Sequence, residues 1–433
     1  MIPTTHSDRY CILGAGASGL AVAKNFLAAK IPFDVIERED DVGGNWYYNR
    51  PNSSVYRSVK LVSSKRLTEY TDFPMPEEYP EYLCQEQAED YLRHYASHFG
   101  LYKHIEFNTA VEEIIPKEDY YQVKLLGGEL RHYRGVVIAN GHNWDPNWPE
   151  IPGNFSGEIL HSSEYKAPKL LEGRRVLVVG AGNSGCDLAV ESAHHAKATF
   201  HSTRRGYHYL PKFLHGKPID LCGERLLRWH LPLWLRRGIA RLAIRITLGP
   251  PWRVGLPKPD HKLFETHPII NSQLYYCLGH GQIKPKDDIV ELCGDSVRFA
   301  DGTKETVDLI LYATGFKISF PFIDKKYLNW NQNCPDLYLN IFHPKNDQLF
   351  VVGLIQPDSG QWGLVDYQSQ LIAQVIRLQE ENLVQAARFK QMKQAERPDL
   401  SAGIHYVKSR RHLLEVEHFS YRTRLQKLLK QFA

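Results

Sequence analysis

Two stretches of the chain share one pattern of apolar and polar positions. In the first, an apolar run at Tyr10–Leu13 leads into a glycine-rich turn, a helically spaced stretch at Leu20–Ala29 and a second apolar run at Phe33–Ile36. In the second, an apolar run at Val176–Val179 leads into another glycine-rich turn, a helical stretch and the run Thr199–Ser202. Short apolar runs alternating with helical spacing predict two β-α-β units with parallel strands.

Both turns carry three glycines at GxGxxG spacing, namely Gly14, Gly16 and Gly19 in the first unit and Gly180, Gly182 and Gly185 in the second. In this pattern the first glycine permits a tight turn, the second lets the backbone approach a pyrophosphate, and the third lets helix and strand pack closely. The N-terminus of the following helix favours phosphate charge. The chain therefore predicts two dinucleotide-binding sites.

The residues that follow the second strand differ between the units. Glu37 stands about 20 residues after the first glycines, where a carboxylate accepts hydrogen bonds from ribose hydroxyls. The second unit instead has Ser202, Thr203, Arg204 and Arg205. A carboxylate there would repel a ribose 2′-phosphate, whereas arginine binds it bidentately. We therefore predict FAD at the first site and NADPH at the second; the alternative for the two arginines is a solvated basic turn.

The remaining pattern completes an α/β fold. It predicts a helix at Gln87–Phe99, strands at Ile105–Val111, Tyr120–Leu126, Gly135–Ala139, Val307–Tyr312 and Leu349–Leu354, a hairpin of Ile289–Leu292 with Ser296–Phe299, a helix at Leu371–Glu381 and helices in the last fifty residues. The simplest architecture has two Rossmann-like dinucleotide-binding domains, the NADP domain inserted into the FAD domain. We expect the first part of the FAD domain at 1–168, the NADP domain at 169–295, and the rest of the FAD domain with C-terminal helices at 296–433.

An insertion at about 222–256 has an unusual charge pattern. Between Leu226 and Arg253, leucine, isoleucine and tryptophan alternate in blocks with arginine, and no acid lies between Glu224 and Asp260. This pattern predicts a basic amphipathic helix. Two interpretations stay open: the helix binds an anionic membrane surface, or its apolar side packs on the protein.

Composition narrows the function classes. A net charge of +4 over 433 residues gives no sign of nucleic-acid binding. The seven cysteines show no CxxC spacing, which predicts reduced thiols and argues against a disulfide reductase. We find no metal or hydrolytic constellation, no signal-peptide core at the N-terminus, and no apolar run of ~18 residues. The expected location is cytoplasmic, either free or peripheral at a membrane surface.

A short signature lies between the two glycine motifs. It reads FxGxxxHxxxY, with Phe155, Gly157, His161 and Tyr165. This signature resembles that of the flavin-containing monooxygenases, the class B flavoprotein monooxygenases that oxygenate nitrogen and sulfur. Further similar stretches are Glu37–Trp46, Asp72–Pro76, Gly182–Asp187, the STRRG, YATGF and SFPF runs, and LYLNIFHP with GLIQP. Related Baeyer–Villiger enzymes usually carry Trp where Tyr165 stands.

The resemblance implies an NADPH- and O₂-dependent monooxygenase. In this family NADPH reduces FAD, and the reduced flavin adds O₂ as a C(4a)-hydroperoxide. A soft nitrogen or sulfur nucleophile, or an electron-rich aromatic such as indole, then takes the distal oxygen. The alternatives are a largely uncoupled NADPH oxidase that makes H₂O₂, a Baeyer–Villiger monooxygenase, and a non-enzymatic nucleotide-sensing protein. A homodimer is also left open.

The resemblance also implies site residues by position. The FAD contacts are Gly14, Gly16, Ala17, Ser18, Gly19, Glu37, Gly44, Asn45, Trp46, Val62 and Ser63, with Thr314 and Gly315 near the flavin. The NADP contacts are Gly180, Gly182, Asn183, Ser184, Gly185, Cys186, Asp187, Ser202, Thr203 and Arg204. His161 and Tyr165 couple the hinge between domains, and Trp362 and Tyr367 face the substrate or belong to the core. No residue is assigned as catalytic in its own right.

One position departs from the family pattern. The family usually has Asn in the loop before DFP, where it donates a hydrogen bond to oxygenated flavin or NADP. Val62 occupies the matching position and cannot donate from its side chain. Loss of one such donor can cost ~3 kcal/mol. Either Ser63 or Ser64 could supply the donor instead; otherwise the enzyme would release H₂O₂.

Overall fold

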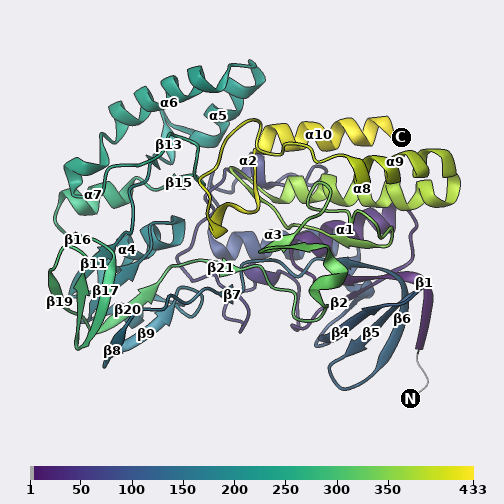
Figure 1. Cartoon of the computed structure of the whole chain (residues 1–433), viewed down its shortest axis with the longest axis horizontal. Coiled ribbons are helices and arrows are strands. Elements are labelled where there is room, and N and C mark those ends of the chain that lie inside the picture. The colour runs from purple at the N-terminus through teal and green to yellow at the C-terminus, as the bar shows by residue number, and fades with distance from the viewer. Residues whose placement is uncertain (1–3) are drawn as a thin grey trace.

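The computed structural model describes residues 4–433 and contains two main β-sheets that lie side by side, with helices packed above them in the view of Figure 1. The first sheet is mixed, because β5 is antiparallel to both β4 and β6, and the second is parallel throughout. Residues 1–3, the start of the stretch in which no signal peptide is predicted, lie outside the described residues. All seven cysteines are free thiols.

The first sheet has seven strands in the order β3-β2-β1-β6-β5-β4, with β24 paired to β6. Their bounds are β1 Thr4–Leu13, β2 Phe33–Ile36, β3 Ile105–Glu106, β4 Val111–Pro116, β5 Tyr121–Leu125, β6 Leu130–Ile138 and β24 Leu349–Val351. The central strand β1 is parallel to both neighbours, and Tyr10 pairs with Phe33 on one side and Gly135 on the other. Because parallel strands end at one edge, the first glycine turn lies at the carboxyl edge of the sheet.

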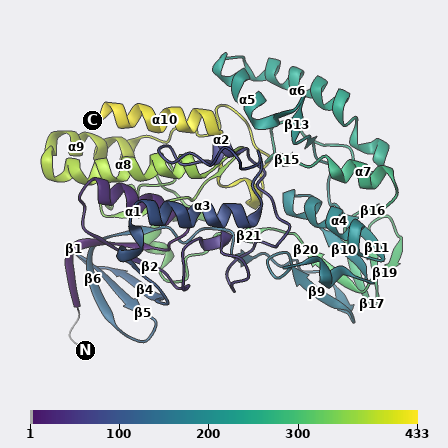
Figure 2. The same cartoon turned by 180° about the vertical axis from the view of Figure 1, so that it is seen from behind.

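Five helices pack on or beside this sheet, namely α1 Ala17–Ala28, α3 Gln85–His98, α8 Trp362–Glu381, α9 Leu383–Ala395 and α10 His418–Gln431. In the view from behind, α1 and α3 are drawn between the strands of this sheet and helices α8 to α10 (Figure 2). Helix α1 packs against α8, and α8 packs against α10. The last fifty residues are therefore only partly helical, since 396–417 forms an irregular segment between α9 and α10.

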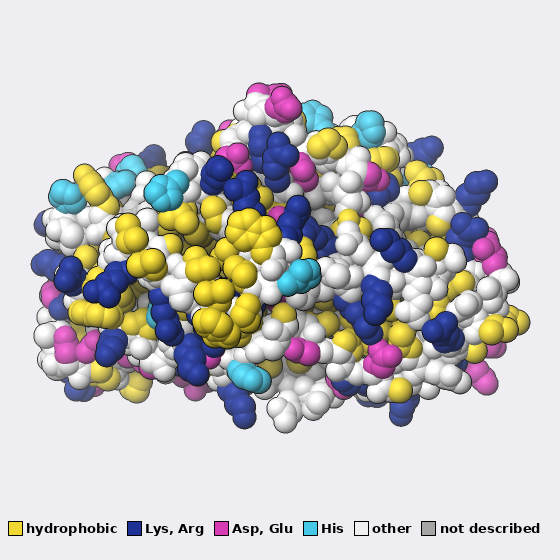
Figure 3. All heavy atoms as spheres, turned by 90° about the horizontal axis from the view of Figure 1, so that it is seen from above, with side chains coloured by type: hydrophobic (Ala, Val, Ile, Leu, Met, Phe, Trp, Pro, Cys, Tyr) yellow, Lys and Arg dark blue, Asp and Glu magenta, His cyan; other side chains and the backbone are white. Residues whose placement is uncertain are grey.

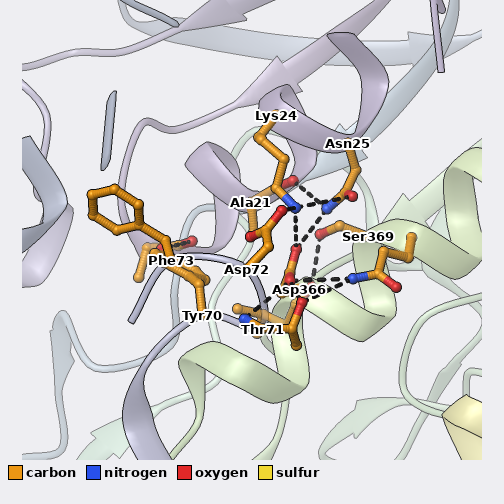
Figure 4. Close-up of polar contacts among 12 residues, drawn as sticks. Ala21, Lys24, Asn25, Tyr70, Thr71, Asp72, Phe73, Asp366 and Ser369 are labelled. Atoms are coloured by element: carbon orange, nitrogen blue, oxygen red, sulfur yellow. Dashed lines mark hydrogen bonds and ion pairs between the residues drawn. The ribbon is translucent and has the colours of Figure 1, made fainter. Parts of the chain in front are cut away.

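A buried charge network holds α1 against α8. Lys24 of α1 donates to Asp366 at 3.0 Å and to Asp72 at 2.7 Å. Asn25 donates to the same Asp366 oxygen at 2.7 Å, and Thr71 donates to its other oxygen. In Figure 4 these side chains point toward one another from α1, α8 and the 71–72 loop. The helix that follows the first glycine motif is thus fixed by ion pairs as well as by apolar packing.

The second sheet has five strands in the order β16-β11-β10-β20-β9. Their bounds are β9 Glu158–His161, β10 Arg175–Val179, β11 Ala198–Ser202, β16 Ile283–Lys286 and β20 Leu309–Tyr312. Beside it lies a smaller sheet, β19-β18-β17-β8, formed by Lys304–Thr306, Ser296–Phe299, Ile289–Gly294 and Gly153–Phe155. Strands β8, β9 and β20 lie outside the predicted 169–295 segment, so strand pairing extends the second unit in both directions.

The insertion is not one helix. It forms α5 Ile219–Arg228 and α6 Leu233–Thr247, joined by a turn in which His230 has a φ of +52°. Pro232 lacks the amide that would continue α5 and disfavours helical geometry at the preceding residue, which explains the break. The predicted strand Ile105–Val111 is also interrupted, because Asn108 has a φ of +54° and its amide donates to the carbonyl of Glu39.

Other elements complete the chain. The helices are α2 Lys65–Thr68, α4 Asn183–His195 and α7 Gln273–Gly279, and the short strands include β12 Tyr209–Leu210, β13 Phe213–Leu214, β14 Lys217–Pro218, β15 Ile269–Ile270, β25 Gln356–Pro357 and β26 Glu415–Val416. Helix α8 begins nine residues before the predicted Leu371, because Trp362, Leu364 and Val365 are buried in the core and lengthen its apolar side. In the part of the chain that the structure describes, none of the helices is both long and apolar enough to span a membrane.

Candidate active site between the two glycine motifs

Both glycine motifs open into one cavity of about 1510 Å³. Most of the predicted site residues line its wall: Gly14, Gly16, Ala17, Ser18, Glu37, Gly44, Asn45, Trp46, Val62, Ser63, Gly180, Gly182, Asn183, Ser184, Asp187, Ser202, Arg204, Thr314 and Gly315. Gly19, Gly185, Cys186 and Thr203 are buried behind this wall. The structure therefore brings the two predicted sites together in a single space.

The two glycine turns have matching backbones. Gly14 and Gly180 have φ of +99° and +123°, a region that side chains rarely adopt. A Cβ on Gly19 would lie 1.8 Å from the carbonyl oxygen of Gly14, and one on Gly185 would lie 1.9 Å from that of Gly180. The third glycines thus serve the close packing of helix on turn, which explains why they lie off the cavity wall.

The first turn is supported by an acid and a backbone loop. The Glu37 carboxylate is buried and accepts from the amides of Ala15 at 2.6 Å and Glu39 at 2.9 Å. Burial raises the pKa of Glu37, although these two hydrogen bonds act in the opposite direction. A Cβ on Gly16 would lie 3.3 Å from the Cα of Gly44, so the 43–46 loop passes close to the glycine turn.

The second turn is surrounded by different chemistry. Both carboxylate oxygens of Asp260 accept from Arg205 at 2.8 Å, whereas Arg204 is exposed on the cavity wall and makes no hydrogen bond or ion pair with the described residues. Asp187 accepts from Asn271 at 2.7 Å, and burial raises its pKa to about 6 despite the opposing charge of Lys212. Of the two candidate arginines, Arg204 is therefore the one free to meet a phosphate.

In the loop that contains Val62, the hydroxyl of Ser63 is not free to donate a hydrogen bond into the cavity. Thr68 donates its hydroxyl proton to the carbonyl of Ser64 at 2.8 Å. The 2.8 Å contact between the Ser63 and Thr68 hydroxyls must therefore use the Ser63 proton. The Ser64 hydroxyl is buried without a hydrogen-bond partner among the described residues, and its amide donates to Asp220 of α5 at 2.7 Å.

The FxGxxxHxxxY residues lie beside the cavity rather than on its wall. His161 contacts the carbonyl of Gly315 at 3.1 Å and the hydroxyl of Ser163 at 2.9 Å, and burial lowers its pKa. Tyr165 is buried and packs edge-on against Tyr56 at 5.5 Å. His161 thus supports Gly315, which does line the cavity.

Of the two aromatic residues predicted to face the substrate or belong to the core, only Trp362 lines the cavity. Trp362 is buried, lines the cavity and lies 6.0 Å from Trp46, ring centre to ring centre. Tyr367 lies off the cavity wall, where its hydroxyl accepts from Gln426 at 2.8 Å.

Sequence reasoning missed one part of the wall. Ser409–Leu414, in the irregular segment before α10, reaches the cavity from the C-terminal region, although the sequence there indicates only basic helices. The only local sign of a binding role is the basic run Arg410, Arg411, His412. Nothing in the spacing of these residues indicates that they contact a turn more than 200 residues earlier in the chain.

The residues present fit FAD and NADP. Each motif offers a glycine turn on the cavity wall, a helix N-terminus, and a strand end whose side chains suit one of the two nucleotides. The fold and the shared cavity define the class, a flavoprotein oxidoreductase with two dinucleotide-binding units.

Comparisons with known proteins agree. Residues 7–430 match the family model of flavin-binding monooxygenase-like proteins. The chain is 33% identical over 392 residues to flavin-containing monooxygenase 5 of Rattus norvegicus, covering 85% of this chain and 73% of that protein. It is 32% identical over 395 residues to dimethylaniline monooxygenase [N-oxide-forming] 2 of Macaca mulatta, covering 86% and 74%. The chain belongs to the flavin-containing monooxygenase family and is an oxidoreductase that uses FAD and NADPH.

Solved structures support the fold. A crystal structure of cyclohexanone monooxygenase with bound ε-caprolactone superposes with a TM-score of 0.73 at 19% identity, covering 99% of this chain and 98% of that chain. S-allyl-L-cysteine S-oxygenase from Allium sativum gives a TM-score of 0.68 at 21% identity, covering 99% and 90%.

Proposed function

We propose that this protein uses NADPH and O₂ to oxygenate soft nitrogen or sulfur nucleophiles, or electron-rich aromatics such as indole. The single observation that carries the proposal is that both dinucleotide motifs open into one cavity of about 1510 Å³. A shared cavity allows the nicotinamide of one nucleotide to meet the flavin of the other. FAD supplies the redox and oxygen chemistry when bound, and the protein supplies binding, orientation and exclusion of water.

The roles of the chain's own residues follow from their places. The turn at Gly14 and Gly16 and the 44–46 loop hold the flavin nucleotide, and Glu37 accepts from its ribose. The turn at Gly180 and Gly182 holds the second nucleotide, and Arg204 binds its 2′-phosphate. Gly315, supported by His161, and the buried ring of Trp362 face the space between them.

The test measures how much oxygenated product forms for each NADPH consumed. Purified FAD-loaded protein would be given NADPH, O₂ and one of four substrates: a tertiary amine, a thioether, indole or a cyclic ketone. We expect NADPH consumption to match N-oxide, S-oxide or oxygenated indole. Lactone formation from the ketone in preference to these products would favour a Baeyer–Villiger enzyme, and no NADPH consumption at all would contradict both.

A second candidate function, an NADPH oxidase that releases H₂O₂, is favoured by the Val62 loop. Val62 has no donor, and the Ser63 proton is already used by Thr68. Val62 and Ser63 therefore offer the cavity no side-chain donor at the position that the family resemblance gives to Asn, and the unpartnered hydroxyl of Ser64 lies off the cavity wall. In this case H₂O₂ would account for nearly all NADPH with every substrate, and Val62→Asn would raise product per NADPH; Val59→Asn, another substitution on the cavity wall, is the matched control.

We further propose that α5 and α6 face an anionic membrane. The exposed fractions of Trp229, Trp234 and Ile246 are 70%, 72% and 74%, and Leu242 and Trp252 are also exposed. Figure 3, which looks down on this end of the molecule, shows a hydrophobic patch with Lys and Arg around it. Exposed arginines on the same helices, Arg225, Arg228, Arg241 and Arg245, would complement anionic lipid.

Vesicle co-sedimentation tests this surface. Binding should require phosphatidylserine in the vesicles, and Trp234→Ala or Ile246→Ala should each weaken it about tenfold, since burying such a side chain contributes about 1.5–3 kcal/mol. Leu126→Ala removes an equally exposed apolar side chain, 73% exposed, from a distant turn and is the control. Dimerisation that these substitutions abolish, without vesicle binding, would instead make the patch an interface between two copies.

A further inference from the structure

A side chain from the C-terminal segment lies directly over the second glycine turn. A Cβ placed on Gly182 would be 3.5 Å from Nη2, 3.8 Å from Cζ and 4.0 Å from Nη1 of Arg411. The guanidinium therefore covers the second glycine of this motif, which is the glycine that lets a pyrophosphate approach the backbone. At the first motif the equivalent position is faced by the backbone of Gly44 and carries no charge.

The guanidinium of Arg411 contacts one aromatic ring but no acid or hydrogen-bond acceptor among the described residues. Among the described residues, Arg411 makes no hydrogen bond or ion pair, and its planar group lies over the ring of Tyr207 at 5.6 Å. The contrast is with Arg205, whose guanidinium is occupied by Asp260. An arginine fork held on an aromatic ring and facing a cavity remains available to bind an anion.

The segment that carries Arg411 is held in place from two sides. The ring of His412 contacts the carbonyl of Val407 at 2.8 Å and the amide of His267 at 3.3 Å. Just beyond, β26 pairs with β25 through Gln356 and Glu415, and Glu415 contacts His267 at 3.2 Å. Arg411 is thus presented by a loop fixed to both the second unit, through His267, and the first, through Gln356.

We propose that Arg411 binds the pyrophosphate of NADP(H), opposite the N-terminus of α4, while Arg204 binds the 2′-phosphate. The inference rests on the proposed function, because it takes the second motif to be the NADP site. Two cations and a helix N-terminus would then hold the pyrophosphate and the 2′-phosphate at separate places. The C-terminal segment is in this way part of the nucleotide site and not only a cover for the first sheet.

Equilibrium binding to the FAD-loaded enzyme, measured by calorimetry, tests the assignment without turnover. The probes are NADP⁺, NAD⁺, which has the pyrophosphate but no 2′-phosphate, and 2′-AMP, which has the 2′-phosphate but no pyrophosphate. Arg411→Ala should weaken NADP⁺ and NAD⁺ by the same factor, about ten- to a hundredfold, and leave 2′-AMP unchanged. Arg204→Ala should weaken NADP⁺ and 2′-AMP but not NAD⁺.

Two further variants separate this contact from general charge or folding effects. Arg411→Lys keeps the charge and loses the fork, so its loss should be intermediate. Lys408→Ala removes a cation from the same segment, off the cavity wall, and should change binding by no more than about twofold. Bound flavin, read from its absorbance, checks that each variant folds.

The outcomes that contradict the inference are distinct from failure of the proposed function. Wild-type affinity of Arg411→Ala for NADP⁺ would overturn the Arg411 assignment alone. So would an equal loss of 2′-AMP and NADP⁺ binding in that variant, because Arg411 would then act at the adenosine end or on the fold. If the wild-type protein bound neither NADP⁺ nor 2′-AMP, both the inference and the proposed function would fall.

Discussion

The two glycine motifs share a backbone and differ in what surrounds it. In each, a central parallel strand runs into a turn whose third glycine touches the carbonyl of the first at a place where a Cβ would lie under 2 Å away, 1.8 Å at Gly19 and 1.9 Å at Gly185. Around the first turn stand a buried acid, Glu37, and the Gly44 backbone; around the second stand Arg204 and Arg411. We propose that the backbone provides a general dinucleotide site and that the surrounding side chains decide which dinucleotide is bound.

The helices that follow the two turns are also anchored differently. Helix α1 is held through Lys24 and Asn25 to Asp366, a fully buried carboxylate. Helix α4 is held by amide contacts, in which Asn183 bonds to the backbone of Pro268 and Ile270. An ion pair thus fixes the first helix, whereas Asn183 and Asp187 fix the second through hydrogen bonds to uncharged partners, so the two units should respond differently to substitution.

The largest expected effect is on the stability contributed by Asp366, the carboxylate that anchors α1. Asp366→Ala leaves the buried Lys24 with Asp72 as its one remaining acid among the described residues, and the side chain of Asp72 is 46% exposed, so the substitution should lower the free energy of unfolding by about 3 to 5 kcal/mol. Urea unfolding of the FAD-loaded protein measures it. Asp72→Ala, which removes the more exposed partner, is the matched control and should cost about 1 kcal/mol or less. Equal losses for the two variants would remove the distinction between buried and exposed partners.

The next effect is a loss of cofactor binding that differs between the two glycine turns. Gly19→Ala and Gly185→Ala introduce the same clash with a carbonyl oxygen, so each should cost about 1 to 3 kcal/mol locally. We expect Gly19→Ala to lose bound flavin, and Gly185→Ala to keep flavin but lose NADP⁺ binding. Flavin absorbance and NADP⁺ calorimetry give the two readouts. Gly223→Ala, in α5 with nothing within 4 Å of the new Cβ, should change neither.

A smaller effect is expected on the preference of the second site for NADP⁺ over NAD⁺. Arg204→Ala should reduce the preference for NADP⁺ over NAD⁺ by about ten- to a hundredfold, because its guanidinium has no protein partner among the described residues. Arg205→Ala should leave that preference nearly unchanged and cost about 1 kcal/mol of stability or less, since it breaks a partly exposed pair with Asp260. Dissociation constants for both nucleotides decide; a larger loss of preference in Arg205→Ala would reverse the assignment.

Much of this comparison can be predicted from the sequence, because the repeat of strand, glycines and helix is local. The predicted strand Phe33–Ile36 coincides with β2, and the fold class and family are confirmed. The break at Pro232 followed from a known effect of proline but was hidden by the surrounding apolar and arginine blocks. The place of Arg411 over Gly182 joins positions far apart in the chain, and the direction of the Ser63 proton depends on Thr68, so neither leaves a pattern in the sequence.

The smallest expected effect concerns two acids on the cavity wall, Glu37 in the first motif and Asp187 in the second. Burial raises the pKa of Glu37, and it raises that of Asp187 to about 6 from an ordinary 3.8. An acid with a raised pKa binds its proton in the folded protein at a higher pH than in the unfolded chain. Its ionisation therefore costs stability above the folded pKa, and the free energy of unfolding rises as the pH falls through that value.

Asp187→Asn should remove this rise between about pH 7 and about pH 5, so that the stability difference between variant and wild type changes by about 1 kcal/mol over that range. Glu37→Gln should act with the same sign and also loosen flavin, because its amide offers one acceptor where the carboxylate serves the amides of both Ala15 and Glu39. Urea unfolding at several pH values measures both. A wild-type stability advantage over Asp187→Asn that shrinks on acidification would mean that hydrogen bonding from Asn271, rather than burial, governs Asp187.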